Sequence, residues 1–102
     1  MTPTHMNGSW FAIQRHRRLA GEHFAAAVLS SLQAHVTDRA EALYVAHCGL
    51  GQPIKALARV CRQRPRNLRR MLAGVEDRRD DPATDARIDG LTGWAQRELV
   101  AC

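Results

Sequence analysis

Two short apolar stripes, separated by a few residues, constrain the fold of this chain most strongly. Each has apolar residues at positions i, i+3, i+4 and i+7, the spacing of one buried face of an α-helix. The stripes are Ile54, Leu57, Ala58 and Cys61, then Leu68, Met71, Leu72 and Val75. Pro53 and Pro65 stand at the start of these segments, and proline favours the first helical turn. The sequence therefore predicts helices over residues 53–61 and 65–79, joined by a turn of three residues, 62–64.

Other segments also have helical patterns. Residues 10–21 are amphipathic, and residues 39–47 follow Thr37 or Asp38 as a helix cap. Asp81 and Pro82 begin a last helix that reaches about residue 99. A helix over 22–36 is predicted to bury Phe24, Ala27, Val28 and Leu32, and the last helix carries Ile88, Leu91, Trp94 and Leu99. Since no alternating run of β-branched residues occurs, the prediction is an all-α fold of five to six helices.

The length of 102 residues suits one domain with a modest core. We expect a flexible tail over residues 1–8 and a single helical domain over 9–102. The longest apolar run, FAAAVL, is too short to span a bilayer, and the N-terminus lacks the basic-then-apolar order of a secretion signal. Cys48 and Cys61 are predicted to be buried, Cys102 to be exposed. These features predict a cytoplasmic, nucleoid-associated protein without a membrane partner.

Positive charge is concentrated in one block of the chain. The net charge is +5 overall, but residues 59–79 carry eight arginines against Glu76 and Asp77, which gives +6. Residues 1–58 carry +2, and residues 80–102 carry −3. Arginine supplies fourteen of the fifteen cations, and its planar fork of donors matches phosphate and guanine edges.

The charged block largely coincides with the two helices predicted over residues 53–61 and 65–79. Two helices joined by a three-residue turn form a helix-turn-helix, here about residues 53–79, whose second helix enters the major groove of DNA. A helical wheel places Arg66, Arg70 and Ala73 opposite the apolar stripe. We therefore predict base-reading roles for Arg64, Arg66, Asn67 and Arg70, and phosphate-binding roles for Lys55, Arg59, Arg62 and Arg69. The periodicity alone leaves a solvated helix face equally open.

Residues 39–91 resemble the C-terminal DNA-binding domain of the bacterial replication initiator DnaA. The run RAEALYVAHCGLGQPIKALARVCRQRPRNL matches that family in spacing, and VEDRRDDPATDARIDGL is closer to small stand-alone DnaA-like proteins. The resemblance implies a Trp-repressor-like helix-turn-helix fold and binding to double-stranded DNA. Similar domains form part of activators of phage-like gene transfer agent clusters. The likeness implies a transcriptional activator that reaches RNA polymerase through a separate partner protein.

Departures from the family change the expected target. The initiators read their DNA box with an Arg-Asp-His-Thr-Thr type sequence, and the matching positions here are Gln63, Arg64, Pro65, Arg66 and Asn67. We therefore expect a target other than the initiator box. The family's turn glycine is Arg62 here, which costs about 1 kcal/mol if φ is positive. No Gly-x-x-x-x-Gly-Lys loop occurs, so no nucleotide cofactor is expected.

Several alternatives stay open or are disfavoured at this point. The basic helix could bind an acidic protein partner, such as RNA polymerase or a DNA-bending protein, or the chain could regulate replication initiation by competing for DNA. A non-specific coat is disfavoured because residues 59–79 contain no aromatic residue. The cluster Arg15–Arg18 is better explained as a solvated face. Neither the five histidines nor the three cysteines have metal-ligand spacing, so we expect no enzyme, no catalytic residue, no metal and no small-molecule substrate.

Overall fold

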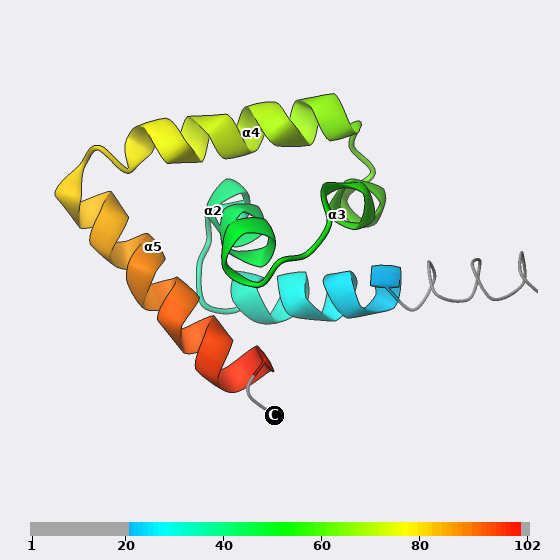
Figure 1. Ribbon diagram of the computed structural model, residues 1–102, viewed down its shortest axis with the longest axis horizontal. Helices are drawn as coiled ribbons and strands as arrows, with labels where there is room; N and C mark the ends of the chain where they lie inside the picture. The colour runs from blue at the N-terminus through cyan, green and yellow to red at the C-terminus, as the bar shows by residue number, and fades with distance from the viewer. Residues whose placement is uncertain (1–20, 101–102) are drawn as a thin grey trace, which may run out of the picture.

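Helices make up the architecture of residues 21–100, the part of the chain that the computed structural model describes. The chain is helical over 21–33, and then forms α2 (Arg39–Tyr44), η1 (Val45–Gly49), α3 (Ile54–Cys61), α4 (Pro65–Arg78), α5 (Pro82–Ala95) and η2 (Gln96–Val100) (Figure 1). No strand occurs in this part, so the all-α prediction is confirmed. The predicted tail, most of the helix over 10–21, the Arg15–Arg18 cluster and Cys102 lie outside the described residues.

Capping residues set the starts of three helices. Asp38 Oδ1 accepts hydrogen bonds from the amides of Ala40 and Glu41, at 2.9 and 3.3 Å, before α2. Asp81 Oδ2 accepts from the amide of Thr84 at 3.0 Å before α5. Proline is the first residue of α4 and of α5, where its missing N–H costs no helical hydrogen bond. These starts were predicted, and they are confirmed.

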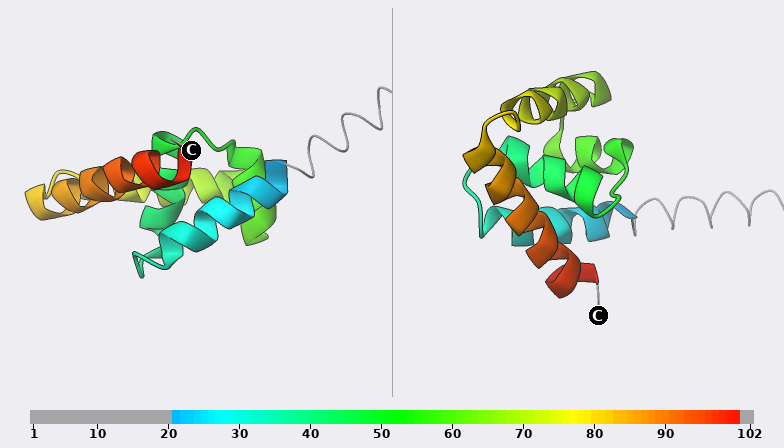
Figure 2. Two further views of the ribbon diagram at one scale, coloured as in Figure 1. Left: turned by 90° about the horizontal axis from the view of Figure 1, so that it is seen from below. Right: turned by 60° about the vertical axis from the view of Figure 1, so that its left-hand side comes forward.

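The core lies around α2 and α3. The helix over 21–33 and α4 lie on opposite sides of these two helices, and α5 runs along one end (Figures 1 and 2). From α4, the predicted stripe residues Leu68, Leu72 and Val75 are buried. Ile88 of α5 is buried as well, while Leu91, Trp94 and Leu99 pack against the core at its edge. The C-terminal helix therefore covers the core, one of two roles, with dimer formation, that its apolar residues left open.

The first described helix is rotated from its predicted orientation. Its buried residues are Ala25, Val28, Leu29 and Leu32. Phe24 is 52% exposed and Ala27 is also exposed, so their predicted burial is wrong. Two apolar stripes overlap in this alanine-rich segment, and the one that packs in the core is the one with i, i+3, i+4, i+7 spacing that includes Leu29.

The predicted helix over 39–47 changes its type after Tyr44. It is α-helical only to Tyr44 and continues as a π-helix, in which Leu50 N donates to Val45 O at 3.1 Å. A π turn holds more residues than an α turn, so residues beyond it face another direction. Cys48, within this π-helix, is exposed, contrary to its predicted burial, whereas Cys61 is buried as predicted.

Candidate nucleic-acid interface

A three-residue turn joins α3 to α4. Arg62 ends α3 with φ 55° and ψ 41°, and is the only non-glycine residue with positive φ between residues 21 and 100. In this conformation Gln63 N donates to Ala58 O at 2.9 Å, which closes the last turn of α3. The positive φ considered for this position is therefore present. The turn sends α4 across the end of α3, which Figure 1 shows nearly end-on.

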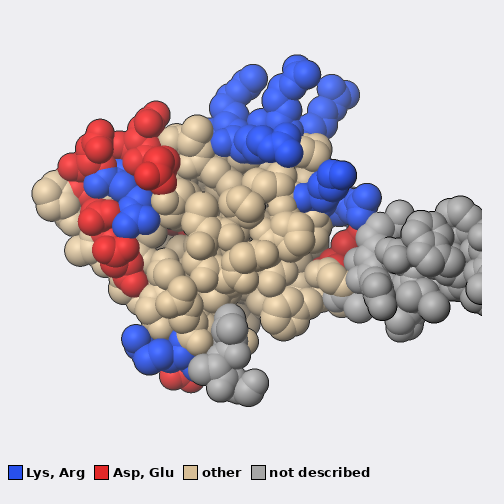
Figure 3. Space-filling view, viewed as in Figure 1, with Lys and Arg blue, Asp and Glu red and all other residues tan. Residues whose placement is uncertain are grey.

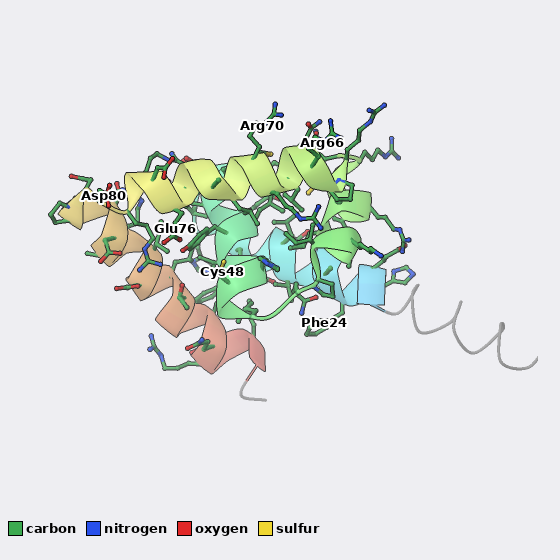
Figure 4. The ribbon with its side chains drawn as sticks, turned by 45° about the horizontal axis from the view of Figure 1, so that its top comes forward. Phe24, Cys48, Arg66, Arg70, Glu76 and Asp80 are labelled. Carbon is green, nitrogen blue, oxygen red and sulfur yellow. The ribbon has the colours of Figure 1, made fainter. Side chains whose placement is uncertain are left out.

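The packing of α4 fixes the direction of its arginines. Because Leu68, Leu72 and Val75 face the core, the opposite side of the helix faces solvent. Arg66 and Arg70 project from that side, away from the body of the molecule (Figure 4). They lie one helical turn apart.

The four residues predicted to read bases come together at the start of α4. A hollow of about 440 Å³ is lined by Arg64, Pro65, Arg66, Asn67 and Arg70. Arg64 precedes the first helical residue, and no side chain caps the helix start. The first N–H groups of a helix have no partner within the helix, so this end also carries a partial positive charge. The partial positive charge of this uncapped helix start was not predicted, although Arg64–Pro65 in place of a Ser, Thr or Asp cap was a signal for it.

The residues predicted to hold phosphates lie around this hollow. Lys55 and Arg59 line a second hollow of about 280 Å³, with Gln63 and Pro65, on the α3 side. Arg62 is exposed in the turn. Arg69 lies on another flank of α4, beside Ala73 and Glu76, and faces the π turn. The structure thus places phosphate candidates on both sides of the outward face of α4.

Ion pairs divide the cations of the chain into two groups. At the C-terminal end of α4, Arg78 pairs with Asp38 at 2.9 Å, and Arg79 pairs with Asp85 and Asp89 at 2.6 Å each. Six cations at or near the start of α4 have no carboxylate within 4.0 Å among the described residues: Lys55, Arg62, Arg64, Arg66, Arg69 and Arg70. We call these six residues the cationic face. Arg39 in α2 and Arg97 in η2 also lack such a partner, but they lie on other elements. Figure 3 shows Lys and Arg side chains gathered without acids over one end of α4 and mixed with acids at the other.

Arg59 differs from the other predicted phosphate ligands. Its Nη1 donates to Glu22 Oε1 at 3.0 Å, and the Arg59 side chain is 48% exposed. An exposed pair of this kind contributes little stability and exchanges readily with other anions. Arg59 can therefore join the cationic face only by giving up or sharing Glu22.

Protonation equilibria agree with this division. The hydrogen bond from Arg78 holds the pKa of the Asp38 carboxyl below its usual value. Hydrogen bonding to Asp85, and then to the Tyr44 hydroxyl, raises the pKa of Arg79. Both shifts favour the charged forms, so the C-terminal end of α4 is a set of charges that neutralise one another.

A further hollow, of about 340 Å³, lies between the π turn and α4. Tyr44, His47, Cys48, Ile54, Arg69, Leu72, Ala73 and Glu76 line it. The Tyr44 hydroxyl donates to Glu76, and His47 Nδ1 lies 2.7 Å from the carbonyl oxygen of Gln52. Although Cys48 as a residue is exposed, partial desolvation of its thiol, and then the charge of Glu76, raise the pKa of the thiol, which favours the less reactive protonated form. No cluster of three or more metal-ligating side chains occurs between residues 21 and 100.

The helices of the described segment also bear on a membrane role. None of them combines the length and the apolarity that crossing a bilayer requires.

The hollow at the start of α4 and the cationic face around it form the candidate interface of this chain. Comparison of the chain with protein families, with curated proteins and with solved structures found no match.

Proposed function

We propose that this chain binds double-stranded DNA as a helix-turn-helix protein, with the N-terminal half of α4 in the major groove. The observation that carries the proposal is the separation of charges along α4. Arginines at its C-terminal end are neutralised by Asp38, Asp85 and Asp89, whereas the six residues of the cationic face have no such partners among the described residues. Unpaired, exposed arginines at one helix end form the electrostatic footprint of a phosphate-binding surface.

The shape of α4 supports the same function. Ala73 and Gly74 are exposed on the side that faces away from the core, and a Cβ atom added at Gly74 would meet nothing within 4 Å. Because these two small residues follow Arg70 on the exposed side of α4, the helix can approach the floor of a groove closely. Lys55 and Arg62 lie toward α3 and Arg69 lies on another flank of α4, so we expect them to contact the phosphate backbones on the two sides of the groove.

The biological role proposed with this binding is regulation of transcription. It rests on the resemblance of residues 39–91 to DnaA-type DNA-binding domains, and it includes activation of a phage-like gene cluster through a separate partner that contacts RNA polymerase. The target is proposed to differ from the initiator box because Arg64, Pro65, Arg66 and Asn67 replace the residues that read it.

A salt titration of DNA binding by the full chain tests the proposal. The four proposed phosphate ligands, Lys55, Arg59, Arg62 and Arg69, give a slope of log K against log salt near −4, at about −0.9 per contact. Removal of one phosphate contact in Arg69→Ala should flatten the slope by about one, whereas Arg39→Ala, an exposed arginine of α2, should leave it unchanged. An affinity that does not change between about 50 and 200 mM salt would contradict DNA binding.

Two further comparisons separate this function from its alternatives. An excess of polyglutamate should displace little bound duplex, because the proposed face matches a groove rather than any acidic polymer. Displacement as strong as that by unlabelled duplex would favour an acidic protein partner instead. Duplexes with the initiator box and with a scrambled box should bind equally, and strong preference for the box would favour a role in replication initiation.

A further inference from the structure

The hollow at the start of α4 has a more specific chemistry than a general attraction to phosphate. We infer that the DNA element it takes contains two guanines, no more than about two base-pair steps apart, contacted in the major groove by Arg66 and Arg70. This inference rests on the proposed function and specifies its target.

The lining of the hollow determines the base. Three of its five residues are arginines, and a guanidinium offers five donors and no acceptor. In the major groove, guanine is the base that presents two acceptors and no donor, O6 and N7, so it matches a guanidinium with two hydrogen bonds. No Asp or Glu lines the hollow, so no carboxylate there would accept a bond from the amino group of cytosine. Asn67 is the one side chain in the lining that also has an acceptor, and it suits adenine.

The spacing of the arginines determines how far apart the guanines lie. Four residues of α-helix rise about 6 Å, at 1.5 Å per residue. Base pairs are stacked about 3.4 Å apart along each strand, so Arg66 and Arg70 reach bases that are at most about two steps apart. The helix angle in the groove decides between adjacent guanines and guanines with one base between them.

The residues that follow Arg70 on α4 limit the length of the DNA element that the helix contacts. The next residues on the outward side of α4 are Ala73 and Gly74, which carry no side-chain donor, and then Asp77, which a phosphate repels. Base contacts therefore come from the first two turns of α4. These turns span about 10 Å, which corresponds to roughly three base pairs.

Base analogues in a selected duplex test the inference. We expect selection of full-length protein on random duplexes to enrich a core with two guanines within three positions. Replacement of either guanine by 7-deazaguanine, which lacks the N7 acceptor, should weaken binding by about tenfold. Replacement by inosine, which lacks only the minor-groove amino group, should leave the affinity unchanged.

Charge-conserving variants provide the matched control. Arg66→Lys and Arg70→Lys keep the charge but lose the planar fork that binds N7 and O6 together, so each should reduce the 7-deazaguanine effect at one guanine and keep the salt slope. Arg69→Lys, on the flank of α4, should keep the full 7-deazaguanine effect and the salt slope.

A selected core without guanines, or equal binding of the deaza and natural duplexes, would overturn the inference. If salt-dependent duplex binding persists in that case, the proposed function still stands. Failure of the chain to bind any duplex would overturn both.

Discussion

Arg62 has a backbone conformation that glycine would adopt at lower cost. Its φ of 55° and ψ of 41° lie in the left-handed region, where the Cβ atom of an L-residue crowds the following carbonyl at a cost of about 1–2 kcal/mol. The side chain is exposed in the turn between α3 and α4 and has no ion-pair partner among the described residues. A strained, unpaired cation next to the hollow at the start of α4 is consistent with a phosphate contact that outweighs the strain.

Two substitutions at this position separate strain from charge. Arg62→Gly should raise the free energy of unfolding by up to about 1 kcal/mol, because relief of strain exceeds the roughly 0.4–1 kcal/mol of added chain entropy. Arg62→Ala keeps the Cβ atom and should give no such gain. Both should flatten the salt slope of DNA binding by about one. Urea unfolding and binding titrations measure the two effects. Equal stability of the glycine and alanine variants would show that the turn is unstrained.

The helices show what sequence patterns could and could not predict. The starts of α2, α4 and α5 followed from Asp38, Pro65 and Asp81, because a cap acts within three or four residues of chain. The exposure of Cys48 did not follow, because the π turn after Tyr44 depends on packing rather than on local preference. The orientation of Phe24 was missed for the same reason.

The candidate site divides in the same way. The outward direction of Arg66 and Arg70 followed from the stripe on the other side of α4. The ion pairs did not, because they join residues far apart in the chain, such as Arg59 with Glu22 and Arg78 with Asp38. Sequence could therefore locate the charges, but only the structure shows which of them are neutralised.

Asp38 links the start of α2 to the end of α4, so we expect the free energy of unfolding to fall at acid pH, where Asp38 becomes protonated. Its pKa is lowered in the folded state, chiefly by the hydrogen bond from Arg78, so its contribution is present above the unfolded pKa and is lost as pH falls through the folded pKa. Asp38→Asn keeps a capping side chain but loses the ion pair. Wild type should be more stable than this variant by about 0.5 kcal/mol at about pH 7, since the pair is partly exposed, and the difference should vanish at about pH 2.

Urea unfolding at the two pH values measures this difference. Asp80→Asn is the matched control, because the Asp80 side chain makes no ion pair or hydrogen bond with another described residue. A gap between wild type and Asp38→Asn that is unchanged in acid would show that the cap, and not the ion pair, distinguishes them.

A two-point contact fastens α5 to α2. Arg87 Nε and Nη2 donate to Glu41 Oε1 and Oε2 at 2.9 and 3.1 Å, and the Glu41 side chain is only 3% exposed. Arg87→Ala would leave a buried carboxylate without this partner. We expect a loss of about 2–3 kcal/mol, below the 3–5 kcal/mol of a fully buried pair because Arg87 itself is half-exposed.

Thermal or urea unfolding checks the role of this contact. Arg97→Ala, at an exposed arginine beyond α5, should change the stability by less than about 0.5 kcal/mol. Adding Glu41→Gln to Arg87→Ala should recover part of the loss, since the amide carries no charge to desolvate. A cost of Arg87→Ala no larger than that of the control would show that apolar packing alone holds α5.

The described part of the molecule is electrically polar along α4. The cationic face lies at one end, and Asp77, Asp80, Asp81, Asp85 and Asp89 lie at or beyond the other, where Arg78 and Arg79 are already paired (Figures 3 and 4). A polyanion should therefore meet the start of α4 and avoid the corner between α4 and α5. Arg66 and Asp80 are fourteen residues apart, which corresponds to about 20 Å along the helix.

This orientation predicts an effect of the acidic corner that depends on salt. Over 20 Å in water, one charge repels one phosphate by about 0.2 kcal/mol. At about 0.15 M salt the screening length is about 8 Å, so Asp80→Asn should change DNA affinity by less than about twofold. At about 0.01 M the screening length is about 30 Å, and the repulsion by several phosphates adds up. The same variant should then bind severalfold more tightly than wild type.

Binding titrations at the two salt concentrations measure this effect. Arg69→Gln is the control, because it removes a close charge and should weaken binding at both concentrations. If Asp80→Asn instead tightens binding several-fold at the higher salt as well, the Asp80 carboxylate lies within a screening length of the phosphates. DNA would then run along the whole of α4, because only a duplex that reaches the α4–α5 corner brings phosphates that close to Asp80.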